Sequence, residues 1–148
     1  MAEPGTGARA TGGARLLVAV YALFAVAATS RAAVQIATRF DEAPLAYLLS
    51  ALAAAVYVVA TVAISRRTPA WHRVALAACT FELLGVLAVG TLSLFDDEAF
   101  PDATVWSVYG RGYLFVPLVL PVAGLVYLRR HPVPAGAERD HALREPGG

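Results

Sequence analysis

The chain has one cysteine, no lysine and few charged side chains of either sign. Charged residues make up 16% of its 148 residues, and all twelve basic residues are arginines. A single cysteine cannot close a disulfide within the chain, and three scattered histidines do not have the spacing of a metal site. The arginines form no basic stripe of the kind that binds nucleic acid. We therefore expect no disulfide, no metal, no cofactor and no nucleic-acid partner.

Apolar residues dominate what is present. They account for 58% of the chain, against about 45–50% in an ordinary soluble domain, and the mean hydropathy is +0.60. They gather into four runs, at 16–38, 44–64, 74–95 and 113–128. A helix needs about 17–25 apolar residues to cross a bilayer, so the runs predict four spans, the last of them short. The predicted fold is an all-α, four-helix bundle embedded in the lipid bilayer.

The rest of the chain divides around these spans. The transmembrane domain is predicted over 15–130, with one long external loop at 96–112. The ends, 1–14 and 131–148, are rich in glycine, proline and charge and show no apolar periodicity. Both ends are predicted to be disordered tails.

Arginines and acids fall on opposite sides of the predicted spans. One side collects Arg9, Arg15, Arg66, Arg67, Arg73, Arg129, Arg130, Arg139 and Arg144, and the other has only Arg39 and Arg111. Positively charged flanks stay in the cytoplasm, so the pattern predicts a multi-pass protein of the cell membrane with both termini cytoplasmic. The external side carries the acids, at Asp41, Glu42, Asp96, Asp97, Glu98 and Asp102. Trp106 and Tyr109, near a span end, are expected in the headgroup layer.

The first span has an alternative interpretation. Arg9 and Arg15 followed by "LLVAVYALFAVAA" resemble the start of a signal peptide, with "AVA" at 25–27 as a crude cleavage site. Cleavage would leave three spans and would place Arg31 in a solvated terminus. Apolar character resumes after Arg31, which favours a continuous helix and four spans.

Two charged residues lie inside predicted spans, Arg31 in the first and Glu82 in the third. Each costs about 2.5–3.5 kcal/mol at the centre of a membrane helix, so each needs a partner. Counted from Arg15, Arg31 lies about 24 Å along its helix, whereas Glu82 lies about 14 Å beyond Arg73. Helix tilt and the lean of the long arginine side chain leave a direct Arg31–Glu82 salt bridge open.

Separate partners are the other possibility for Arg31. Pro117 and Pro121 remove helix hydrogen bonds and free the carbonyls of Tyr113 and Pro117 at about the depth of Arg31. The guanidinium could donate to these carbonyls, with the Ser50 hydroxyl as an additional acceptor.

In that case, the partner of Glu82 would be Tyr57 of the second span. Glu82 and Gly85 also share a helix face with Ala75, Ala78 and Val89, which suits close packing of helices. Two interpretations follow: a polar clamp that fixes helix register, or a titrating site of a proton-coupled carrier. The clamp is the favoured interpretation.

The function expected from the sequence is therefore non-enzymatic. No nucleophile or metal arrangement is present, and the short loops leave no room for a soluble catalytic domain. We expect an accessory or assembly subunit that packs as a homo-oligomer or in a larger membrane complex. The alternative is a small oligomeric proton-coupled transporter that uses Glu82.

Two stretches carry a resemblance. The segments "APLAYLLSALAAAVYVVATVAI" and "FELLGVLAVGTLSLFDDEAFPDATVWS" resemble small, uncharacterised four-helix integral membrane proteins of actinobacteria. The resemblance covers the four-span region only and implies no activity. Small multidrug transporters also have four short helices, but their hallmark glutamate lies in the first helix, where this chain has Arg31.

Overall fold

Helices are the only regular secondary structure in the part of the chain that the structure describes. The computed structural model describes residues 6–133, with side chains from residue 12 onward. The four long helices are α1 (Thr6–Arg39), α2 (Pro44–Ser65), α3 (Pro69–Phe95) and α4 (Val116–Arg130), and two 3-10 helices, η1 (Phe40–Glu42) and η2 (Ser107–Tyr113), lie between them. No strand occurs within 6–133. The all-α prediction is confirmed.

Three helical segments are long and apolar enough to cross a membrane. They are Gly12–Glu42, Pro44–Ser65 and Pro69–Phe95. The predicted fourth span, 113–128, is not one continuous helix. A bend of 100° separates η2 from α4, and a fourth span results only if this bent pair is counted as one. Three to four apolar helices of this kind suit a membrane-embedded protein.

The bend has a local cause in the backbone. Leu114 and Phe115 adopt left-handed φ values of 55° and 59°, which end η2 and turn the chain into α4. Pro117 follows in the first turn of α4, where its missing N–H would have no helical partner in any case. Pro117 therefore starts the helix instead of breaking it, whereas Pro121 lies inside α4.

Helix α1 is longer than the sequence predicted. It begins at Thr6, so residues 6–14 are helical although they were expected to belong to a disordered tail. It also continues without a break past the possible cleavage site at 25–27 and past Arg31. The rest of the expected tails lies mostly in 1–5 and 134–148, outside the described residues; 131–133 are described and are not helical.

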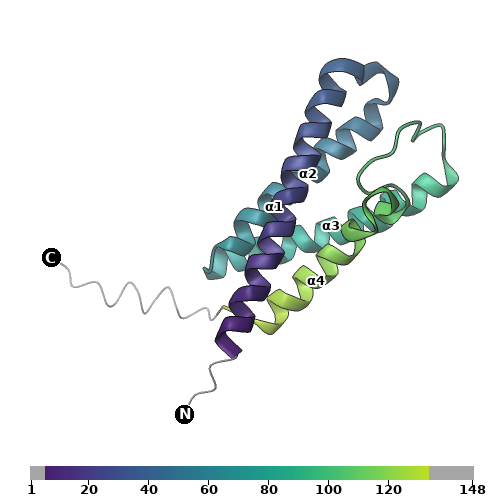
Figure 1. Cartoon of the computed structure of the whole chain (residues 1–148). Coiled ribbons are helices and arrows are strands. Elements are labelled where there is room, and N and C mark those ends of the chain that lie inside the picture. The colour runs from purple at the N-terminus through teal and green to yellow at the C-terminus, as the bar shows by residue number, and fades with distance from the viewer. Residues whose placement is uncertain (1–5, 134–148) are drawn as a thin grey trace, which may run out of the picture.

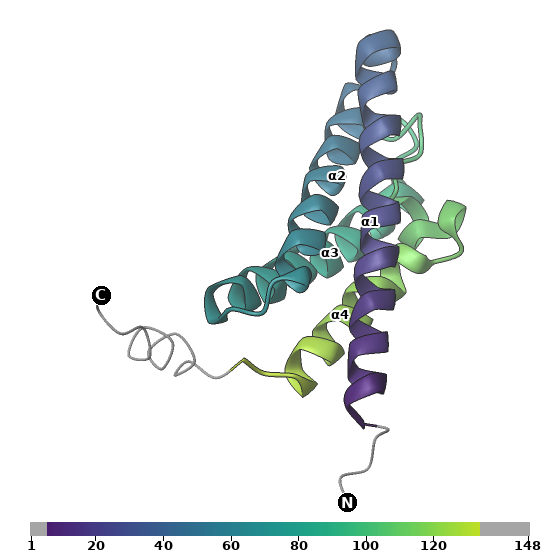
Figure 2. The ribbon, with the colours of Figure 1, turned by 60° about the vertical axis from the view of Figure 1, so that its left-hand side comes forward.

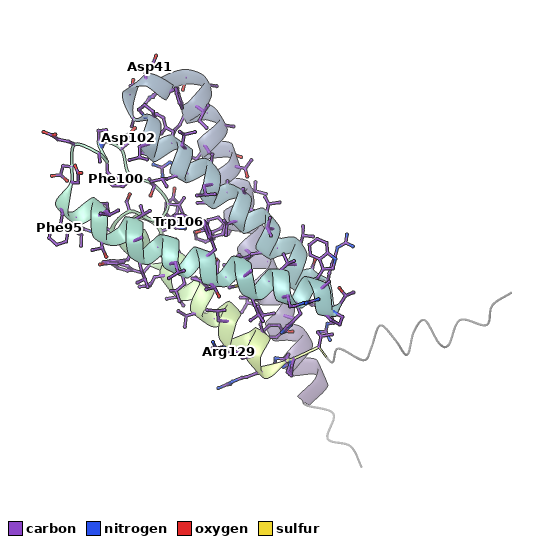
Figure 3. All side chains as sticks on the ribbon, turned by 180° about the vertical axis from the view of Figure 1, so that it is seen from behind. Asp41, Phe95, Phe100, Asp102, Trp106 and Arg129 are labelled. Carbon is purple, nitrogen blue, oxygen red and sulfur yellow. The ribbon has the colours of Figure 1, made fainter. Side chains whose placement is uncertain are left out.

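The helices form two hairpins that cross at an angle. α1 packs along α2, and α3 packs along α4 (Figure 1). The start of α1 and the end of α4 lie at one end of the molecule, and the α1–α2 tip extends away from α3 at the other (Figures 1 and 2). The loop after α3 lies between the two tips, with Phe100 and Asp102 between Phe95 and Asp41 (Figure 3).

The core combines small residues with a few large aromatic rings. Ala46, Ala60 and Ala75 are fully buried and let the helix backbones approach closely. Trp106 was expected in the headgroup layer, but it is 1% exposed. Its ring lies over Gly85 of α3, where an added Cβ would be 2.7 Å from a ring carbon. The absence of a side chain at Gly85 therefore makes room for a tryptophan that comes from the loop.

Candidate functional site

Glu82 lies at the centre of the molecule and has a tyrosine as its partner. The residue is fully buried, and its Oε2 accepts a hydrogen bond of 2.7 Å from the hydroxyl of Tyr21 in α1. The same hydroxyl lies 3.4 Å from the Sγ of Cys79, one turn before Glu82 on α3. Burying a carboxyl without a hydrogen bond costs free energy. The bond from Tyr21 avoids this cost and also joins α1 to α3.

The partner of Glu82 differs from the sequence prediction. Tyr57 was expected, and its ring does lie close by, with its centroid 6.2 Å from that of Tyr21. Its hydroxyl, however, has no hydrogen-bond partner among the described residues, and the same holds for Glu82 Oε1 and Trp106 Nε1. The buried cluster thus contains one satisfied carboxylate oxygen and three polar atoms that no other described group satisfies.

The neighbours of Tyr21 explain why α1 supplies the hydroxyl. Leu17, Tyr21, Ala25, Ala28 and Ala32 are buried at intervals of three and four residues, so they form the face of α1 turned to the core.

Gly124 brings α4 against the same cluster. A Cβ at Gly124 would be 2.8 Å from Cys79 Sγ and 3.3 Å from the Tyr21 hydroxyl. The glycine therefore lets α4 close over the cluster.

Arg31 does not bond to Glu82. Its NH1 donates a hydrogen bond of 2.5 Å to the hydroxyl of Tyr113, and its NH2 donates one of 2.9 Å to the carbonyl of Ala103. The buried Glu82 and the half-buried Arg31 thus have separate partners, and no direct salt bridge forms between them. The acceptors also differ from the expected ones: the hydroxyl of Tyr113 replaces its carbonyl, and Ser50 donates to Ala46 of its own helix.

The loop between α3 and α4 is bound to the helices at several points. The hydroxyl of Tyr47 in α2 donates to Asp102 Oδ2 at 2.5 Å, and the backbone N–H of Val108 donates to Ser93 Oγ in α3 at 2.8 Å. Within the loop, the backbone N–H groups of Trp106 and Ser107 donate to Thr104 Oγ1. Together with the bonds from Arg31, these contacts connect the loop to α1, α2 and α3.

The six acids that the sequence analysis placed outside the membrane are not arranged as a metal centre. Asp102 is half-buried and bonded to Tyr47, whereas the others are exposed, at Asp41, Glu42, Asp96, Asp97 and Glu98. Asp96 accepts a hydrogen bond from the backbone N–H of Ala99 and so caps the turn after α3. Within 6–133, no group of three or more His, Cys, Asp or Glu residues is placed to hold a metal ion.

The sequence did not point to Tyr21, Cys79 or Trp106 as parts of this site. A tyrosine and a cysteine within apolar runs are read as ordinary core residues, and only the buried face of α1 could have identified Tyr21. Trp106 lies in a loop whose path depends on long-range contacts.

Comparison with known proteins adds no relative. No protein-family model, curated protein or solved structure matches this chain.

Proposed function

We propose that this chain is a non-enzymatic multi-pass protein of the cell membrane, with both termini in the cytoplasm, that acts as an accessory or assembly subunit. The observation that carries the proposal is the use of both intramembrane charges for internal connections. Glu82 is bonded to Tyr21 of α1, and Arg31 is bonded to the loop and to Tyr113. Side chains used in this way fix the arrangement of the helices.

A shallow groove between α1 and α2 supports a role in assembly. It encloses about 530 Å³ and is lined by small and apolar residues, including Thr29, Ala33, Ala51, Ala55 and Val59. Small residues allow a second transmembrane helix to approach closely, so the groove suits a helix of another copy or of a larger complex.

Site-specific photocrosslinking tests this role. A benzophenone amino acid placed at Ala33 or Ala55, both exposed in the groove, should give one discrete crosslinked product in native membranes. The matched control is the same amino acid at Val122, which is 45% exposed on α4. Mass spectrometry of the product then distinguishes a second copy from a different subunit. Equal or absent crosslinking at the groove and control positions would contradict the assembly role.

A proton-coupled transporter is the second candidate, and one observation favours it. The Oε1 of Glu82 is buried and has no hydrogen-bond partner among the described residues, so this oxygen is free to take up a proton. In liposomes with a pH gradient, a carrier would lose its proton flux on Glu82→Gln and keep it on Glu98→Gln in the exposed loop. Flux that is absent from the unmodified protein would remove this candidate.

The three-span alternative makes a different prediction for the mature chain. Cleavage after 25–27 would remove Tyr21, the donor to Glu82, together with Leu17 and Ala25 from the core. These contacts favour retention of the segment. An intact mass of the purified protein tests it, because a cleaved chain would lack the residues up to the cleavage site.

A further inference from the structure

A second pocket lies beside Arg31, away from the Glu82 cluster. It encloses about 470 Å³ between α1 and the bend that precedes α4. Its lining residues are Arg31, Thr104, Ser107, Arg111, Gly112 and Tyr113, with Ala103 and Val108. This pocket brings together Arg31, from the first predicted span, and Arg111, from the loop before α4.

The charge of the pocket is positive. Two guanidinium groups line it, and among the residues that the structure describes no carboxylate does so. The nearest acid along the chain, Asp102, has its Oδ2 engaged by the hydroxyl of Tyr47. An anion in the pocket would therefore meet two cations and no lining carboxylate.

The donors in the pocket are held in place and still have bonding capacity. A guanidinium has five N–H donors, and Arg31 uses two of them, toward Tyr113 and Ala103. These two bonds fix the orientation of the group without using its remaining donors. The Tyr113 hydroxyl accepts from Arg31, so its own proton is available to a ligand.

The opening of the pocket suits a ligand that arrives from the membrane surface. Arg111 is exposed, and a Cβ added at Gly112 would meet nothing within 4 Å, so the rim is open at this point. Directly after Tyr113, the side chains of Leu114 and Phe115 are 87% and 46% exposed. Apolar side chains beside a cationic pocket match the two parts of a phospholipid, its acyl chains and its phosphate.

We propose that this pocket binds a phosphate group, with the guanidinium groups of Arg31 and Arg111 and the hydroxyl of Tyr113 as donors. Planar guanidinium groups bind phosphate through paired hydrogen bonds, which makes arginine well suited to this anion. The source of the phosphate is the headgroup of an anionic lipid, and a free phosphate ion offers the same chemistry.

Binding to the purified full chain in a neutral detergent tests the proposal. The probes are short-chain phosphatidylglycerol, inorganic phosphate and short-chain diacylglycerol, each titrated by calorimetry. Arg111→Gln removes one exposed cation without touching the core, and Arg39→Gln, at the exposed arginine that ends α1, is the matched control. Loss of a charge-assisted hydrogen bond should weaken phosphatidylglycerol binding about tenfold or more in Arg111→Gln and leave Arg39→Gln unchanged.

The three probes separate the possible sources. Binding of phosphatidylglycerol with little binding of inorganic phosphate supports a lipid headgroup, and comparable binding of both supports a soluble phosphate. Arg111→Lys, which keeps the charge but loses the planar fork, should bind with intermediate affinity. Diacylglycerol binding as tight as phosphatidylglycerol binding, equal weakening by Arg111→Gln and Arg39→Gln, or no binding of any phosphate probe would overturn the proposal.

Discussion

Tyr21 determines how a carboxyl can be accommodated among the helices. Its hydroxyl donates a hydrogen bond of 2.7 Å to Glu82, and its ring lies beside that of Tyr57, with 6.2 Å between the two centroids. Sequence reasoning found Glu82 and Arg31, because a charge in an apolar run is conspicuous. It did not find Tyr21, because nothing local distinguishes this residue from the other tyrosines, and for Arg31 it named the carbonyl of Tyr113 where the structure has the hydroxyl. The register between two helices decides which of their residues are in contact, and a small shift of one helix along its axis changes these contacts.

Replacement of Tyr21 by phenylalanine tests the bond to Glu82. The change keeps the ring and removes the only hydrogen bond that the described residues give the carboxyl. We expect the free energy of unfolding in detergent to fall by about 1–3 kcal/mol. The matched control is Tyr127→Phe, at a half-buried ring that stacks on His131 near the end of α4. Equal effects of the two changes would show that the Tyr21 hydroxyl contributes nothing specific.

A double-mutant cycle tests whether the two charges act separately. Arg31 and Glu82 share no partner, so the stability losses of Arg31→Leu and Glu82→Leu should add to within about 0.5 kcal/mol. The cycle of Tyr21→Phe with Glu82→Gln should instead show coupling, because these side chains are bonded. Recovery of stability in the Arg31→Leu, Glu82→Leu double variant would indicate a direct ion pair.

At the scale of single elements, the apolar runs predicted the position of α2, the end of α3 but not its start, and not the bend before α4. The predicted span 44–64 matches α2 closely, and 74–95 matches the end of α3. α3 starts earlier than predicted, because Thr68 caps it and Pro69 occupies its first turn, outside the apolar run. The bend before α4 was missed, because the left-handed residues Leu114 and Phe115 are not glycines and have no sequence signature.

Gly124 controls how closely α4 approaches α3. Alanine is the better helix former, but its Cβ at Gly124 would lie 2.8 Å from Cys79 Sγ. We expect Gly124→Ala to lower the free energy of unfolding by about 1–3 kcal/mol. Adding Cys79→Ala removes the sulfur and should recover most of this loss. Gly12→Ala is the control, since a Cβ there meets nothing within 4 Å; similar losses at Gly12 and Gly124 would contradict the packing explanation.

At the scale of the whole molecule, the two hairpins depend on the loop between α3 and α4. The loop is bonded to α1 through Arg31, to α2 through Tyr47 and to α3 through Ser93. The number of apolar segments could be predicted from composition, because the bilayer sets the length of a span. The crossing of the hairpins could not, because it follows from contacts such as Trp106 over Gly85 that join distant parts of the chain.

Cysteine labelling tests the orientation of the whole molecule. Cys79 is fully buried, so the protein without an added cysteine should not react with a membrane-impermeant maleimide. This protein is therefore the negative control. Asp97→Cys, in the exposed acidic loop, should be labelled in intact cells. Arg130→Cys, at the end of α4, should be labelled only after the cells are opened. The reverse pattern would invert the proposed topology.

The bonds of Arg31 also set an order of events during synthesis. Ala103 and Tyr113 are made 72 and 82 residues after Arg31, so α1 and α2 are synthesised before either acceptor exists. A guanidinium that enters the bilayer in this interval has only water, lipid phosphate or the insertion machinery as a partner. A nascent chain that stops before the loop would hold an arginine without its native acceptors. The bonding of α1 is thus completed by residues of the segment between α3 and α4.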